Sequence, residues 1–125
     1  MSKGYILGIS CGYHDSAACL IKDGRVLGAC EEERFTGIKH DNSFPIKSIA
    51  HLYAKNKVQK DDVEAICFYE NPKRKLDRIE QTTKRGHWLW NYFTRRRIIK
   101  RNKKEYDKLN ITLNSITGKD TKIVF

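Results

Sequence analysis

A short polar run near the start of the chain has the residue types of a proton-transfer site. Ser10-Cys11-Gly12-Tyr13-His14-Asp15-Ser16 directly follows an apolar segment. Histidine titrates near neutral pH, so His14 could take a proton from a hydroxyl, and Gly12 lets the backbone turn tightly or approach a ligand closely. Asp15 could fix the tautomer of His14, although adjacent residues on a strand point to opposite faces, which argues against a direct contact. The alternative is a turn histidine beside a capping aspartate.

A second polar cluster, Glu31-Glu32-Glu33-Arg34-Phe35, is followed by Lys39-His40. Of three consecutive carboxylates at a strand end, at least one must face the core, where it needs a partner such as Arg34 or Lys39. One interpretation is a polar strand edge that lines a substrate cleft. The other is a solvated strand end with one internal salt bridge.

The back half of the chain is strongly basic. Residues 1–70 contain nine Lys/Arg against ten Asp/Glu, a net charge of −1, whereas residues 71–125 contain sixteen against five, a net charge of +11. Between Lys84 and Lys104, aromatic residues lie close to the basic runs Arg95-Arg96-Arg97 and Lys100-Arg101. Such a stretch can bind phosphate backbones and stack on bases, or it can be a solvated helix face with its rings buried.

These clusters are separated by elements in the order β-β-β-α-β. Apolar runs predict a strand over 5–9, a second over 15–21 and a third over 25–33, joined by an Asp23-Gly24 hairpin turn into an antiparallel meander. Helical spacing of apolar residues predicts a helix from about Pro45 to Lys55, capped by Asn42 or Ser43. A fourth strand, rich in β-formers, is expected over 63–69.

The remainder is predicted to be mainly helical. One helix should open at Asn71-Pro72 and break near 84–86, and a second should run from His87 past Lys104. A last helical stretch contains Leu109, Leu113 and Ile116 and is closed by Gly118, before a strand begins at 122–125.

The cysteine spacing argues against a disulfide or metal framework, and the hydropathy argues against a membrane or secreted protein. The four cysteines (Cys11, Cys19, Cys30 and Cys67) form no Cys-x-x-Cys motif, so we expect buried, reduced thiols rather than disulfides or a metal site. No apolar run approaches the ~18 residues of a membrane span, and the apolar start is too short for a secretory signal. We therefore expect a cytoplasmic protein with no membrane partner.

At these motifs the chain resembles the amino-terminal portion of the nodulation-protein and antibiotic-type O-carbamoyltransferases. The resemblance rests on Ile6-Leu7-Gly8-Ile9-Ser10, Gly12, His14-Asp15-Ser16-Ala17-Ala18, Asp23-Gly24, Glu31-Glu32-Glu33-Arg34-Phe35, Lys39-His40 and Phe44-Pro45, in order and in register. It implies a partial actin-like ATPase (ribonuclease H-like) α/β domain that opens β-β-β-α-β, followed by basic helices. It also implies a transferase that makes carbamoyladenylate from carbamoyl phosphate and ATP, and then passes the carbamoyl group to a hydroxyl of a sugar, antibiotic or polysaccharide.

Carried over by position, the resemblance implies that His14 and Asp15 are catalytic residues of the transfer step. Further candidates for substrate contacts are the remaining glycine and polar residues of the motifs: Gly12, Ser16, Glu33, Arg34, Lys39 and His40. The family uses a divalent metal such as iron, held in part by a His-x-x-x-His motif. No two of the four histidines here have that spacing, so we expect no metal ligands in this chain.

The charge distribution and the order of the elements divide the chain into a β-β-β-α-β unit over 1–70, a basic helical insertion over 71–118 and the start of a strand over 119–125. We expect the whole of 1–125 to be the amino-terminal part of a transfer domain that is inactive alone. Its expected partners are a hydroxyl-bearing acceptor and the remainder of the enzyme, or a second polypeptide, with the metal and donor sites. The alternative is a non-catalytic module whose 71–118 region binds nucleic acid or another acidic partner.

Overall fold

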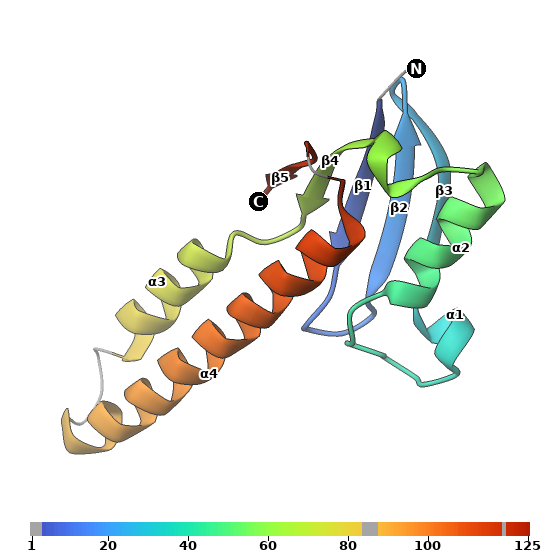
Figure 1. Ribbon diagram of the computed structural model, residues 1–125. Helices are drawn as coiled ribbons and strands as arrows, with labels where there is room; N and C mark the ends of the chain where they lie inside the picture. The colour runs from blue at the N-terminus through green and yellow to red at the C-terminus, as the bar shows by residue number, and fades with distance from the viewer. Residues whose placement is uncertain (1–3, 84–87, 119) are drawn as a thin grey trace. The chain divides into compact units, whose positions relative to one another are not determined.

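The computed structural model describes residues 4–83, 88–118 and 120–125, and these divide into two compact units. The first unit is built from Met1–Tyr69 together with Thr117–Phe125, and the second from Glu70–Ile116. The first holds a mixed five-stranded sheet and the second a pair of helices (Figure 1). The predicted α/β class is therefore confirmed.

The sheet has the strand order β3-β2-β1-β4-β5. Strands β1 (Tyr5–Ser10), β2 (Ala17–Lys22) and β3 (Arg25–Glu31) form the predicted antiparallel meander. On the other side of β1, β4 (Val63–Phe68) and β5 (Lys122–Val124) continue the sheet in parallel. The third strand is shorter than predicted, because the chain leaves the sheet at Glu32 to form a four-residue helix, α1 (Glu33–Thr36), that the sequence did not indicate.

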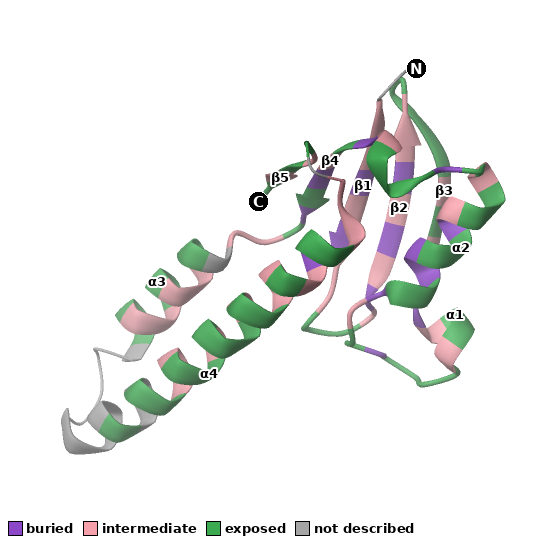
Figure 2. Cartoon of the chain, viewed as in Figure 1, coloured by how far each residue is buried: buried purple, intermediate pink, exposed green. Residues whose placement is uncertain are grey.

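Alternation of side chains explains how the central strands pack. Leu7 and Ile9 of β1 and Ala18 and Leu20 of β2 are buried, and the residues between them are only partly covered (Figure 2). All four cysteines are free thiols, but the expectation that they are buried is wrong. Cys11, Cys19 and Cys30 are only partly covered, and Cys67, between buried Ile66 and Phe68, is exposed on the other side of β4.

Helix α2 (Ile46–Asn56) packs against β2 and β3 on one face of the sheet (Figure 1). Its buried side chains are Ser48, Ile49 and Leu52. The contact is close, because a Cβ placed on Gly28 of β3 would lie 2.8 Å from Cδ2 of Leu52. A short 3₁₀ helix, η1 (Lys60–Asp62), directly precedes β4.

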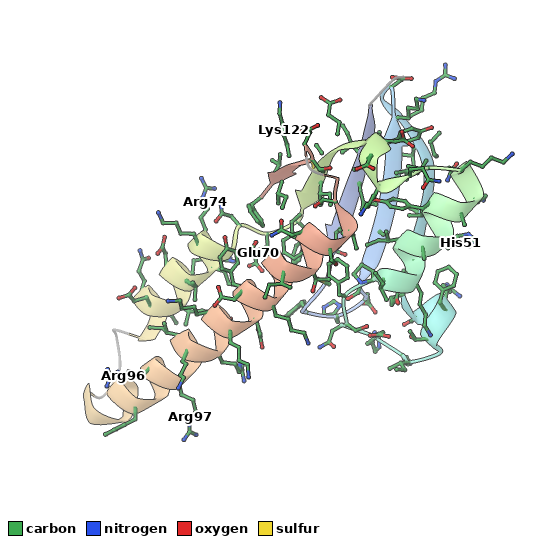
Figure 3. The ribbon with its side chains drawn as sticks, viewed as in Figure 1. His51, Glu70, Arg74, Arg96, Arg97 and Lys122 are labelled. Atoms are coloured by element: carbon green, nitrogen blue, oxygen red, sulfur yellow. The ribbon has the colours of Figure 1, made fainter. Side chains whose placement is uncertain are left out.

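The second unit pairs α3 (Pro72–Thr83) with α4 (Trp88–Ile116). The two predicted helical stretches after His87 are one 29-residue helix, and the predicted break at 84–86 lies outside the described residues. Glu70, labelled in Figure 3, precedes α3. Its carboxylate pairs with Lys75 at 3.2 Å and Arg78 at 2.6 Å. No helix in the described ranges is both long enough and apolar enough to cross a membrane.

Helix α4 ends at Ile116, close to Gly118, which the sequence predicted to close it. Gly118 does not have the left-handed backbone that is common at helix ends, since the glycines with positive φ among the described residues are Gly12, Gly24 and Gly37. Glycine is required there by proximity instead, since a Cβ would lie 3.0 Å from Cα of Asp61 and 2.5 Å from its Oδ1.

Candidate functional site

The loop between β1 and β2 lies against the segment that connects α1 to α2. The amide of Gly12 donates to the carbonyl oxygen of Asn42 at 2.9 Å, and the amide of Ser16 donates to that of Asp41 at 2.8 Å. The carbonyl of Ser16 in turn accepts from the amide of Glu32 at 2.8 Å. These backbone bonds bring the two polar clusters of the sequence to one place.

Asp15 joins two histidines there. Its Oδ2 lies 2.8 Å from Nδ1 of His14, and its Oδ1 lies 2.9 Å from Nδ1 of His40. We call these three residues the His14–Asp15–His40 cluster. The expectation that His14 and Asp15 would not touch is wrong, because Asp15 precedes β2 and lies on a bend with φ of 53°. His40 also has a positive φ, 56°, and Asp and His tolerate this conformation better than most residues.

The contacts within the cluster determine which atoms carry protons. Two hydrogen bonds lower the pKa of Asp15, the larger effect coming from His40 and the smaller from His14. The ionised carboxylate therefore accepts a hydrogen bond from each ring. The bond to Asp15 in turn raises the pKa of His40. With Nδ1 of His14 donating to Asp15, Nε2 is the nitrogen left with a lone pair. The His14 side chain is 58% exposed, so that nitrogen is accessible to a substrate.

Glu33 supports the cluster from α1. Its Oε2 accepts the backbone amide of His40 at 2.9 Å, which fixes the loop that presents the His40 ring. The two remaining charged candidates are less constrained. Arg34 is 74% exposed and reaches only 3.8 Å from Glu31, and Lys39 is exposed.

Glu32 is the member of the acidic triplet that faces the core, and its partner is neither Arg34 nor Lys39. Only 1% of its surface is exposed. Its Oε1 accepts the amide of Lys47 at 3.0 Å, and its Oε2 accepts the amide and hydroxyl of Ser48, each at 2.8 Å. A carboxylate at a helix amino terminus meets unpaired amides and a favourable dipole, so the helix replaces a cationic partner. The predicted caps Asn42 and Ser43 do not serve α2, whose first helical residue follows Pro45.

Asp41 is a structural residue of the site that sequence reasoning missed. It is nearly fully buried, and its Oδ1 accepts the amide of Ser43 at 2.9 Å while its Oδ2 accepts the hydroxyl of Thr36 at 2.7 Å. Hydrogen bonds from Ser43 first and Thr36 next lower the pKa of Asp41. The signal was present, since an aspartate two residues before a serine is typical of a turn closed by its own side chain.

The residues predicted to contact substrate differ in exposure and in their hydrogen bonds. Gly12 lies in the loop with φ of 86° and is exposed. Ser16 is fully buried, and its hydroxyl has no hydrogen-bond partner among the described residues. The ring of His40 bonds to Asp15, and Glu33 accepts the backbone amide of His40. Arg34 and Lys39 are exposed and do not contact a common group within the described part of the chain.

The chain does not hold the histidine pair of the iron site that the resemblance implies. That site uses two histidines four positions apart, and the histidines at 14, 40, 51 and 87 offer no such pair. His51 lies on α2, is exposed, and stacks near Phe35 with ring centroids 5.2 Å apart. The chemistry of the His14–Asp15–His40 cluster therefore follows from the atoms of these three residues alone.

Known proteins share this segment. Over 78 residues the chain is 46% identical to the uncharacterized protein sll1178 of Synechocystis, which covers 62% of this chain and 13% of that protein. It is 45% identical over 56 residues to the nodulation protein NolNO of Sinorhizobium fredii, covering 45% of this chain and 8% of NolNO. It is 43% identical over 61 residues to the uncharacterized protein MJ1051 of Methanocaldococcus jannaschii, covering 49% of this chain and 11% of that protein.

The chain therefore spans a small part of the length of these relatives. The model of the carbamoyltransferase N-terminus matches residues 5–118, which include the whole second unit, most of the first and every residue of the His14–Asp15–His40 cluster. A match over that much of the sequence, together with the NolNO relative, assigns the family. This chain belongs to the carbamoyltransferase N-terminus family.

Proposed function

We propose that the chain contributes the base for carbamoyl transfer to a hydroxyl group, within an O-carbamoyltransferase of the actin-like fold class. The observation that carries the proposal is the bond between Oδ2 of Asp15 and Nδ1 of His14, 2.8 Å long. It leaves Nε2 of an exposed imidazole free to act on an acceptor, which is the arrangement that a general base needs. The strand order of the first unit is compatible with the actin-like assignment.

In the proposed step the acceptor hydroxyl oxygen attacks the carbonyl carbon of carbamoyladenylate. The hydroxyl proton passes to Nε2 of His14, the bond between the carbonyl carbon and the phosphate oxygen breaks, and AMP leaves. Asp15 stabilises the imidazolium that forms, because its carboxylate accepts a hydrogen bond from Nδ1–H of His14 throughout the step and does not take the proton. The acceptor belongs to the class of hydroxyl-bearing sugars, antibiotics or polysaccharides.

The other steps belong to the assembled enzyme. We propose that carbamoyladenylate formation, and the divalent metal such as iron, depend on residues beyond those of this chain, since the required histidine pair is not among them. Arg34 and Lys39 are exposed cations near the cluster and suit the phosphate of the donor. The chain by itself is expected to turn over no carbamoyl phosphate.

Replacing His14 by Asn in the complete enzyme tests the proposal. We expect carbamoyl transfer to fall by about 10² to 10⁴-fold, the usual contribution of a general base, while formation of carbamoyladenylate persists. Both steps are measured separately, by product analysis with the acceptor and by adenylate formation without it. His51→Asn is the matched control, because His51 is exposed on α2 and makes no bond to the cluster. Unchanged transfer in His14→Asn would show that His14 is not the base of the transfer step.

A second candidate function follows from α4. Exposed cations recur along it, at Arg96, Arg97, Lys100, Arg101, Lys103, Lys104 and Lys108 (Figure 3). Glu105 and Asp107 are the acidic residues in the same stretch, and Glu105 reaches only 3.9 Å from Arg101. A cationic helix face of this kind suits a nucleic acid or another polyanion.

A further inference from the structure

Asp15, Glu33 and His40 each direct one potential metal ligand into the same small volume. One carboxylate oxygen of Asp15, one of Glu33 and a ring nitrogen of His40 all lie within 4.8 Å of one another. They come from three different places: the loop after β1, the start of α1 and the loop that follows α1. From this juxtaposition we infer that the Asp15–Glu33–His40 site binds one divalent first-row transition-metal ion.

The donor set determines the class of ion. One imidazole nitrogen and two carboxylate oxygens suit ions between the hard and soft limits, such as Mn²⁺, Fe²⁺, Co²⁺ and Zn²⁺. Three protein ligands with the remaining positions open is the composition of sites that also bind water or an oxygen-bearing ligand. The side chains of Asp15 and His40 are 40% and 64% exposed, so open positions of the ion face solvent.

One pair of the ligand atoms is already spaced nearly as it would be around a bound ion. Nδ1 of His40 and Oδ1 of Asp15 are 2.9 Å apart. Two ligand atoms that each lie about 2.1 Å from an ion are separated by about 3.0 to 3.4 Å, so a small widening admits it. The ion replaces the proton on Nδ1 of His40, and that proton is released to solvent.

Glu33 also orients the site before an ion arrives. Its Oε2 accepts the His40 amide at 2.9 Å and so holds the carboxylate beside the residue whose ring is the nitrogen ligand. The other oxygen of Asp15 remains on His14 at 2.8 Å. This second bond orients the Asp15 carboxylate, a role that partners of ligating groups commonly have.

The site does not depend on the proposed transfer reaction. Ion binding requires only the described side chains of this chain, whereas transfer requires the complete enzyme.

The spacing of the three ligands explains why the sequence indicated no metal site. Asp15 and Glu33 are 18 positions apart, Glu33 and His40 are 7 apart, and no compact motif links them.

Titration of the purified 125-residue chain with Co²⁺ tests the inference. We expect one equivalent to bind saturably, with d–d absorption bands of nitrogen and oxygen ligands, and Zn²⁺ to compete for it. The key variant is His40→Asn. Asparagine tolerates the left-handed backbone at this position and can still donate an amide proton to Asp15, but it offers no imidazole nitrogen.

His40→Asn should weaken Co²⁺ binding by about tenfold or more, and the control His51→Asn should leave it within about twofold. Far-UV circular dichroism checks that each variant is folded. If His40→Asn does not fold, Glu33→Gln decides in its place, because it removes the ligand charge and keeps an acceptor for the His40 amide.

Three results would overturn the inference. The first is no saturable binding to the wild-type chain. The second is equal binding by the wild-type and His40→Asn chains. The third is an intense thiolate-to-cobalt charge-transfer band, which would show that a cysteine is the ligand instead.

Discussion

Cys30 on β3 offers a thiol whose reactivity can be predicted from its surroundings. Burial, the larger effect, raises the pKa of Cys30, and its Sγ donates a weak hydrogen bond to the carbonyl oxygen of Ser48 at 3.6 Å. Alkylating reagents attack the thiolate. At mildly alkaline pH we therefore expect iodoacetamide to modify Cys30 more slowly than exposed Cys67, and the rate at Cys30 to climb only above the ordinary pH range of a cysteine thiol.

Peptide mapping by mass spectrometry over time measures both rates in one sample. The same reaction in denaturant is the control, because there the two thiols should react alike. Equal rates in the folded chain would show that burial does not protect Cys30.

Single residues show where sequence reasoning reached its limit. His14, Asp15 and His40 were all named from the sequence as candidate site residues. The contact between His14 and Asp15 was not predicted, because it depends on a positive φ at Asp15 that its side chain does not require. The contact with His40, 25 positions later, depends on how two loops meet in space.

The amino terminus of α2 depends on Glu32. We expect Glu32→Ala to lower the free energy of unfolding by about 3 kcal/mol, because two amides and one hydroxyl lose a charged acceptor in the interior. Glu32→Gln should cost less, since its amide keeps one oxygen as an acceptor. Urea denaturation followed by circular dichroism measures both changes.

Glu31→Ala is the matched control for this helix prediction. Glu31 is the preceding residue and also a carboxylate, but its side chain is 48% exposed and its contact with Arg34 is 3.8 Å long. A surface pair of that kind contributes about 0 to 1 kcal/mol. A loss in Glu31→Ala as large as in Glu32→Ala would contradict the anchoring role.

Among the elements, strands were easier to predict than helix ends. Strands β1, β2 and β4 are short runs of apolar and β-forming residues, which identify each strand, and alternating burial in β1 and β2 then separates their inner from their outer face. Helix α1 has four residues and none is buried, so it leaves no periodic pattern. The start of α2 was misjudged because its cap is a residue distant in sequence, although Glu32 continues the face of Gly28 and Cys30.

At the scale of the whole molecule, charge is divided between the two units. The unit over 70–116 has fourteen Lys/Arg against five Asp/Glu, a net charge of +9, which leaves +1 for the rest. If this unit binds a polyanion, affinity for a labelled oligonucleotide should fall by orders of magnitude between about 50 and 200 mM salt. Filter binding at the two concentrations measures it.

Two double charge reversals with the same change in net charge localise that binding. Arg97→Glu with Lys104→Glu on α4 should abolish it and reduce the salt slope, whereas Arg25→Glu with Lys55→Glu in the first unit should have little effect. Similar losses in both would indicate attraction by net charge alone. Absence of binding in the wild-type chain would leave carbamoyl transfer as the sole candidate.

The two backbone bonds that hold the loop after β1, from Gly12 to Asn42 and from Ser16 to Asp41, have a kinetic consequence. A loop that is already ordered loses little conformational entropy when a substrate arrives, so in the proposed transfer step His14 need not search for its reactive position at each turnover. The proposed base is preorganised by the segment of Asp41 and Asn42, which are not among the proposed substrate contacts. Loosening that segment should slow the reaction while every chemical group remains in place.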